Sequence, residues 1–255
     1  MKGIRLSRTG RTERPFYVSS ISVNLYSVEE LLYFLHKYPA LIDDGIRGPE
    51  LTRWLASEFG LGDTAVRMDR GLRLGKTDGD FLLPLFRDTG YLSSAELRRY
   101  TGVLDALGKA PWPERLMKKA DALMRNGRYQ QAVAATYQAE ESAPGADPDF
   151  LASLYCGRGA ALMQLMAMEE AAAAYEKAYR LSPSEERLKV LLCALRITKT
   201  EEAYLLRAEE LGASSGLLAE IDERIREAAE EVPDPEDPDE ALREIREAYH
   251  RETGH

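Results

Sequence analysis

The chain has 255 residues, of which 44% are hydrophobic and 30% are charged, and its formal net charge is −9. This length and composition are enough to bury a sizeable core, so a wholly disordered protein is excluded. The longest apolar stretches, residues 160–168 and 190–195, are far shorter than the roughly 20 residues that a membrane-spanning helix needs. We therefore expect a cytoplasmic protein with no membrane partner.

Basic residues are concentrated at the start of the chain. Residues 1–15 contain five basic side chains and the single acid Glu13. Neither an uninterrupted apolar run nor a small-residue cleavage site follows, so we expect no secretory signal. We interpret this segment as a flexible basic arm. An ordinary solvated terminus explains it better than a nucleic-acid contact, although clustered cations are what phosphate binding requires.

Residues 16–110 show no internal repeat and are predicted to form a small helical bundle. The run 16–23 has strand-like composition, but no second strand is predicted to pair with it, so we interpret it as an extended lead-in. Ser27 and Glu30 have the spacing of a capping box and predict a helix that ends near His36. Further helices are predicted over residues 49–59, 79–86 and 93–107.

This region has two possible roles. Stacked helical repeats need a terminal element that covers their apolar end, and we favour that role for the bundle. The alternative is a separate docking domain that uses an aromatic cluster as its surface. Aromatic residues at helical spacing are more often core than interface, so we expect the cluster to be buried. Its members are Tyr26, Tyr33, Phe34 and Tyr38.

Residues 111–211 have apolar positions at helical spacing, interrupted by short polar turns about every dozen residues. This rhythm predicts helical hairpins. One unit contains Tyr155, Arg158, Gly159, Leu162, Ala171, Tyr175, Ala178 and Pro183. The unit before it repeats the offsets with Leu116, Lys119, Ala120, Leu123, Gly127, Tyr129, Ala132, Ala139 and Pro144.

These offsets resemble those of the tetratricopeptide repeat, whose unit is two antiparallel helices in about 34 residues. Lys119 and Thr136 depart from the usual pattern, since a leucine and an aromatic residue are common there. A third hairpin is predicted over residues 184–211, in a register that the sequence leaves open. The resemblance implies an α-solenoid of about three hairpins. With the helices predicted on either side of it, we expect an all-α protein in which an N-terminal helical bundle is followed by this solenoid and by C-terminal helices.

The resemblance also implies a curved array whose concave face is built from the first helix of each hairpin and holds a peptide or helix of a partner. The family's receptors for chaperone tails use a clamp of Lys, Asn and Arg, which the corresponding residues here do not supply. They are instead mostly apolar and rich in methionine, which suits an adaptable groove for an amphipathic helix. The predicted groove residues are Met117, Asp121, Met124, Cys156, Ala160 and Met163.

Residues 212–255 are strongly acidic and are predicted to form helices. One helix is expected over 216–231 and another from a cap at Asp239 to His250, separated by a proline-rich break at 232–238. The break would allow the last helix to fold back over the groove as a lid. We favour such partial self-coverage over an open groove, because a large exposed apolar trough promotes aggregation.

No residue pattern supports catalysis or a bound cofactor. Residues 71–77 resemble a phosphate-binding loop, but only three residues separate the glycines where four are required. Cys156 and Cys193 lie in apolar helical patterns, and the three histidines are far apart, which removes the usual metal sites. We therefore predict that the chain is not an enzyme and binds no metal or cofactor.

The favoured function is an interaction scaffold or adaptor that binds another protein, whose identity the sequence does not specify. Two alternatives remain. One is a structural component that associates with copies of itself, and the other is a nucleic-acid-linked regulator that uses the basic arm. The acidic bulk of the chain argues against nucleic acid as a partner.

Overall fold

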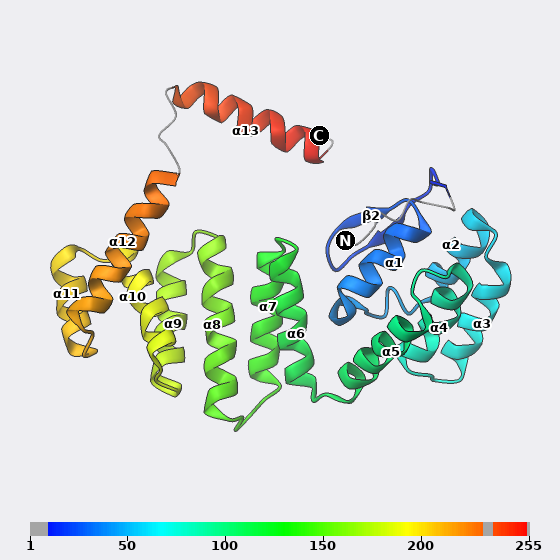
Figure 1. Cartoon of the computed structure of the whole chain (residues 1–255), viewed down its shortest axis with the longest axis horizontal. Helices are drawn as coiled ribbons and strands as arrows, with labels where there is room; N and C mark the ends of the chain where they lie inside the picture. The colour runs from blue at the N-terminus through cyan, green and yellow to red at the C-terminus, as the bar shows by residue number, and fades with distance from the viewer. Residues whose placement is uncertain (1–9, 232–236, 254–255) are drawn as a thin grey trace. The chain divides into compact units, whose positions relative to one another are not determined.

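A computed structural model of the chain describes residues 10–231 and 237–253. Within these residues it contains thirteen α-helices, one short 3-10 helix and one two-stranded sheet (Figure 1). The prediction of an all-α fold class is confirmed, with the small sheet as the exception. The chain divides into two compact units between Arg187 and Leu188, and each unit is described by itself.

The first unit opens with a β-hairpin. β1 (Phe16–Val18) pairs antiparallel with β2 (Val23–Leu25), so that Phe16 lies opposite Leu25. The expectation of an unpaired lead-in over residues 16–23 is therefore wrong, because the partner strand follows directly. Ser22 adopts a left-handed conformation, with φ of 52°, which lets the chain reverse over four residues between the strands.

Five helices and the 3-10 helix follow, and their buried side chains form one apolar core that also includes residues of β1 and β2. Four of the helices lie close to predicted positions. α3 was not predicted, because its sequence is dominated by charged residues and only Ala65 and Met68 supply buried apolar side chains. The elements are α1 (Val28–Lys37), η1 (Pro39–Leu41), α2 (Pro49–Phe59), α3 (Gly62–Arg73), α4 (Asp78–Thr89) and α5 (Ser94–Lys109).

The cap of α1 differs from the predicted capping box. The Ser27 hydroxyl accepts a hydrogen bond from the Glu30 N–H at 3.2 Å, as predicted, but the Glu30 carboxylate accepts from the Tyr26 N–H at 2.6 Å and not from Ser27. A complete capping box does occur at α5, where Ser93 and Glu96 satisfy each other's backbone N–H groups.

The aromatic cluster was expected to be core, and only Phe34 meets that expectation with 3% of its surface exposed. Tyr33 is 50% exposed, and its hydroxyl accepts a hydrogen bond from Lys37 Nζ at 2.6 Å. Tyr26 and Tyr38 are half-buried. Helical spacing placed these residues near one another but did not determine which side of α1 faces the core.

The last residues of the predicted basic arm are held against this region. The Thr12 N–H donates to the Tyr26 carbonyl at 2.9 Å, and Trp54 Nε1 donates to the Arg14 carbonyl at 2.7 Å. The Arg11 guanidinium lies over the Tyr26 ring, 4.9 Å from its centroid. Residues 1–9 of the arm lie outside the described residues.

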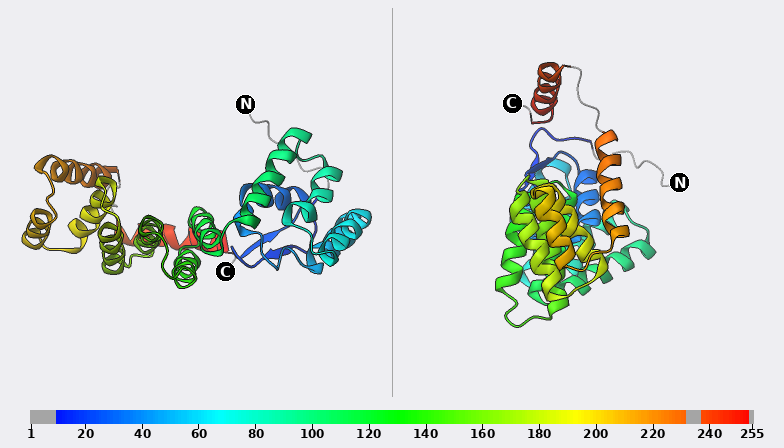
Figure 2. Two further views of the ribbon diagram at one scale, coloured as in Figure 1. Left: turned by 90° about the horizontal axis from the view of Figure 1, so that it is seen from below. Right: turned by 90° about the vertical axis from the view of Figure 1, so that its left-hand side faces the viewer.

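Two helical hairpins complete the first unit. α6 contacts both α7 and α8, and α8 contacts α7 and α9, so the first helices of the two hairpins are neighbours. Viewed end-on in the left panel of Figure 2, the four helices alternate between two rows. The helices are α6 (Trp112–Arg125), α7 (Tyr129–Glu141), α8 (Pro148–Gln164) and α9 (Met168–Leu181).

The N-terminal region and the first hairpin share a core. Leu123 of α6 and Ala132 of α7 belong to the same buried cluster as the side chains of α1, α2 and α4. The 3-10 helix η1 contacts α6 directly. The N-terminal helices thus cover the end of the hairpin array that would otherwise be exposed.

The second unit contains most of α10 (Glu185–Thr198), together with α11 (Glu201–Glu210), α12 (Ser215–Glu231) and α13 (Pro238–Thr253). Leu191, Tyr204 and Ile221 bring buried apolar side chains from α10, α11 and α12. Arg196 of α10 forms ion pairs with Glu201 at 3.0 Å and with Asp222 at 2.8 Å. These contacts hold the three helices together.

The cap of α13 is two positions before the one that the sequence suggested. Asp239 was expected to cap this helix, but it lies inside the first turn. Asp237 takes that role, since its carboxylate accepts from the N–H groups of Asp239 at 2.9 Å and Glu240 at 3.2 Å. Pro238 opens the helix because its fixed φ suits the first helical position. Residues 232–236 of the predicted break lie outside the described residues.

Helices α8 and α9 approach closely at Gly159. A Cβ atom at this position would lie 2.7 Å from a ring carbon of Tyr175. Ala171 and Ala178, which lie before and after Tyr175 on α9, are fully buried. Small residues at these three positions therefore allow the aromatic ring to lie directly against the backbone of α8.

We expect Gly159→Ala to lower the free energy of unfolding by about 1–3 kcal/mol, because the new methyl group overlaps a rigid ring. Gly157→Ala is the matched control, since a Cβ there meets nothing within 4 Å. It should be neutral or stabilising by up to about 1 kcal/mol, because alanine favours a helix over glycine. Urea denaturation followed by circular dichroism measures both, and equal midpoints for the two variants would contradict the close approach.

Candidate protein-binding surface

The six predicted groove residues lie on neighbouring helices of the first unit. Met117, Asp121 and Met124 are on α6, and Cys156, Ala160 and Met163 are on α8. Within each helix they are three or four residues apart, which places them on one side of that helix. Since α6 contacts α8, the structure brings the two sets onto adjacent helices. We call these six residues the α6–α8 surface.

The side chains of the α6–α8 surface are mostly half-buried, and only Asp121 is exposed. Met117 packs beside the buried Leu116 and Leu154, and Met124 packs on the core of the N-terminal region. Cys156 packs against a separate buried cluster of α8 and α9. The exposed apolar area is therefore smaller than the sequence suggested, because the protein's own core already covers part of each side chain.

Burial raises the pKa of both titratable groups of this surface, Cys156 and Asp121. Burial raises the pKa of the Cys156 thiol, against the opposing effect of the Arg187 charge and hydrogen bond. A thiol that remains protonated is a poor nucleophile. Desolvation raises the pKa of Asp121, although the residue is exposed, and the charge of Arg125 partly counteracts the shift.

Arg187 lies at the edge of this surface, at the start of α10. Its Nη1 atom lies 3.3 Å from Asp149 Oδ1 and donates to the Ser182 carbonyl at 2.7 Å. Together with its interaction with Cys156, these contacts position a cation beside the α8 part of the surface. The sequence pattern did not point to Arg187, because it left the register of the third hairpin open.

A buried arginine lies on the opposite side of α8. Only 4% of Arg158 is exposed. Its Nε and Nη2 atoms donate to the hydroxyl and the carbonyl of Thr136, both at 3.1 Å, and Nη2 also donates to Glu140 Oε2 at 2.6 Å. The guanidinium lies 3.8 Å from the ring centroid of Tyr137 and 4.9 Å from that of Tyr155. Thr136, which stands where the tetratricopeptide repeat commonly has an aromatic residue, is therefore bound by Arg158 of the next hairpin.

The carboxylate of Glu140 is stabilised in its charged form by this network. Partial burial acts to raise the pKa of Glu140, but hydrogen bonds from Tyr155 and Arg158 and the charges of Arg158 and Lys177 outweigh it. The pKa of Glu140 therefore lies below its ordinary value. A carboxyl group whose pKa is lowered by folding stabilises the folded protein at pH values above its pKa in the unfolded chain. This stabilisation is lost as the pH falls through its pKa in the folded protein.

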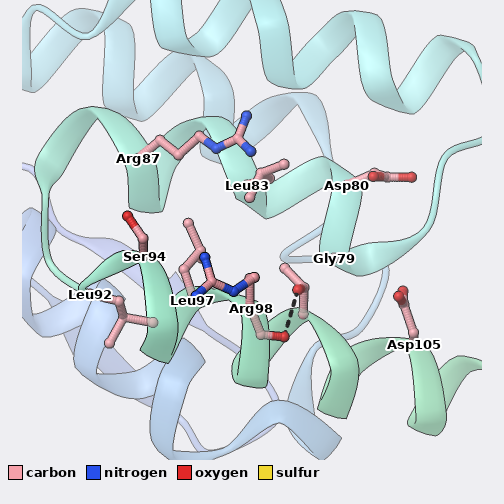
Figure 3. A pocket seen from close by; sticks show the side chains of 10 residues that line it. Gly79, Asp80, Leu83, Arg87, Leu92, Ser94, Leu97, Arg98 and Asp105 are labelled. Carbon is pink, nitrogen blue, oxygen red and sulfur yellow. Dashed lines mark hydrogen bonds between the residues drawn. The ribbon is translucent and has the colours of Figure 1, made fainter.

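Two hollows flank α4 in the N-terminal region. One of about 490 Å³ lies between α4 and α5 and is lined by Arg87, Arg98, Asp80 and Asp105 together with apolar side chains (Figure 3). The other, of about 410 Å³, lies between α3 and α4. Neither hollow is lined by residues of the α6–α8 surface.

The loop-like sequence at residues 71–77 forms the connection between α3 and α4. α3 ends at Arg73, Gly75 adopts φ of 63°, and the Thr77 hydroxyl caps α4. A helix precedes this turn where a phosphate-binding loop requires a strand. Among residues 10–231 and 237–253, no three His, Cys, Asp or Glu side chains come together as a possible metal site. No helix in the described part of the chain is long and apolar enough to cross a membrane.

We expect Arg158→Ala to lower the free energy of unfolding by about 1–3 kcal/mol, because Thr136 and Glu140 lose a buried partner. Arg180→Ala is the control, since Arg180 pairs with Glu176 on the exposed side of α9. Its loss should cost less than about 0.5 kcal/mol. Thermal or urea unfolding of both variants provides the measurement. A cost for Arg158→Ala no greater than that for Arg180→Ala would show that the network contributes nothing to stability.

The pH dependence of stability tests the charged state of Glu140. As the pH falls from neutral through the ordinary value of 4.5 and then through the lowered pKa, the stabilising contribution of Glu140 should disappear. Glu140→Gln should therefore be less stable than the unsubstituted protein at neutral pH, with the difference shrinking in acid. Urea titrations at several pH values measure this, and a difference that is constant across the range would contradict the assignment.

We compared the chain with models of protein families, with curated proteins and with solved structures, and none of these comparisons returned a match.

Proposed function

We propose that this chain is a scaffold or adaptor of the tetratricopeptide type, which binds a helix or peptide of another protein on the α6–α8 surface. The observation that carries this proposal is the stacking of two helical hairpins whose first helices, α6 and α8, are in contact. The likeness to the tetratricopeptide repeat is supported by Gly159, whose missing side chain makes room for Tyr175 at the offset typical of that family.

The chemistry of the α6–α8 surface suits an apolar partner with helical character. Met117, Met124 and Met163 expose part of their side chains, and unbranched thioether side chains adapt to the shape of a bound helix. An amphipathic helix would place apolar residues at i, i+3 and i+7 against such a surface. Asp121 and Arg187 lie beside these apolar positions, where charged residues contribute more to specificity than to affinity.

The proposal is that of a non-catalytic protein. The thiol of Cys156 is the group on this surface most capable of nucleophilic chemistry, and its raised pKa keeps it protonated at neutral pH. Arg158 and Glu140 hold each other in a structural ion pair between the hairpins. The α6–α8 surface thus offers mainly its shape and its apolar area, and these features support binding of another protein.

We expect Met163→Glu to weaken partner binding at least tenfold, because it places a charge among the apolar side chains of the α6–α8 surface. Met166→Glu is the matched control. Met166 is 75% exposed in the turn between α8 and α9, so the same substitution should leave binding unchanged. Affinity capture from the native cell with identification by mass spectrometry, followed by titration of the purified partner, provides the measurement.

The variants also separate the alternatives. Circular dichroism must show equal helicity for both before their binding is compared. A partner that is retained by the intact chain and by Met166→Glu but lost by Met163→Glu supports the proposal. Equal recovery of the same partners by all three chains would exclude this surface as the binding site. A concentration-dependent increase in mass by light scattering, with no foreign partner, would favour self-association instead.

A further inference from the structure

The hollow between α3 and α4 collects cations from three different elements. Arg67 and Arg70 come from α3, Lys76 comes from the turn, and Arg87 comes from the last turn of α4. Two carboxylates, Asp80 and Asp88, also line it, which leaves a local excess of two positive charges in a chain whose net charge is −9. Like charges repel, so four cations around one hollow require an explanation.

Internal ion pairs account for only part of this charge. Arg67 is bound to Asp88, which also accepts a hydrogen bond from the Thr64 hydroxyl. Arg70, Lys76 and Arg87 form no ion pair with any residue in the described part of the chain. All three are exposed, so their charged groups are accessible from solvent.

The turn that carries Lys76 is held in place from outside the hollow. Arg47 Nη2 donates to the Lys76 carbonyl at 2.9 Å, and Arg47 Nη1 pairs with Asp78 Oδ1 at 3.0 Å. The side-chain stem of Lys76 passes close to the buried Gly71, since its Cδ lies 3.9 Å from where a Cβ on Gly71 would be. A turn fixed in this way loses less conformational freedom when a ligand binds.

Stabilisation of helix ends explains individual cations but not the cluster. Arg70 lies in the last turn of α3 and Arg87 in the last turn of α4, where cations interact favourably with the helix dipole. Arg73 has the same position at the end of α3 but does not line the hollow. The convergence of Arg70 and Arg87 with Lys76 therefore needs a second cause.

We propose that this hollow binds a small phosphorylated molecule through Arg70, Lys76 and Arg87. Guanidinium groups bind two phosphate oxygens at once, and a lysine ammonium adds a point charge, so this set matches a ligand with several negative charges. The volume of about 410 Å³ suits a small molecule. Asp80 lies at the Lys76 end of α4, two helical turns from Arg87, with Leu83 between them (Figure 3).

The test is isothermal titration of the intact chain with inorganic pyrophosphate at low ionic strength. We expect saturable binding that Arg70→Gln and Arg87→Gln each weaken roughly tenfold to a hundredfold, because each removes a hydrogen-bonded charge. Arg73→Gln is the control, since it removes the same charge from the same turn of α3 but lies outside the hollow. It should change the affinity less than about twofold, because exposed charges at a distance are screened.

Three results would overturn the proposal. The first is the absence of pyrophosphate binding by the intact chain. The second is an equal loss of affinity in all three variants, which would indicate only diffuse attraction to basic residues. The third is equal affinity for sulfate and pyrophosphate, which would indicate an adventitious ion only. Since the hollow shares no residue with the α6–α8 surface, the variants should still capture the protein partner, so failure of one proposal does not affect the other.

Discussion

The burial of the Arg158 guanidinium between α7 and α8 is the constraint on which the hairpin array depends. A buried charge without partners costs several kcal/mol. α8 packs on α7 where Thr136 and Glu140 accept hydrogen bonds from Nε and Nη2 of the guanidinium. The rings of Tyr137 and Tyr155 cover its faces. A shift of α8 by one residue would break these contacts together, so the network sets the register between the two hairpins.

The neighbouring Gly159 sets the distance from α8 to the next helix. Arg158 and Gly159 use the inward side of α8 for contacts with α7 and α9, and this leaves the side with Cys156, Ala160 and Met163 only partly covered. Residues that are three or four positions apart lie on the same side of a helix. Cys156, Ala160 and Met163 therefore share one side of α8, away from Arg158. The proposed binding surface is thus a consequence of how the inward side is packed.

The N-terminal region bears on both proposals. Its core continues into the first hairpin through Leu123, so it covers one end of the array and keeps α6 in place. Its own surface carries the cationic hollow between α3 and α4, whose turn is held by Arg47. If both proposals hold, one chain binds a protein on the α6–α8 surface and a small anion on the N-terminal region. Both sites belong to the same compact unit.

The sequence by itself determined the helices with strong apolar periodicity, the two hairpins and the offsets of Gly159 and Tyr175, because these follow from interactions within a few turns of helix. It also placed the six residues of the α6–α8 surface at helical spacing, but did not determine how far each is buried. Only the tertiary structure decided the pairing of β1 with β2, the charged helix α3, the contact of Arg158 with Thr136 and the convergence of Arg70, Lys76 and Arg87. Each of these depends on residues that are distant in sequence or on a turn with an uncommon backbone conformation, and local patterns carry no information about such contacts.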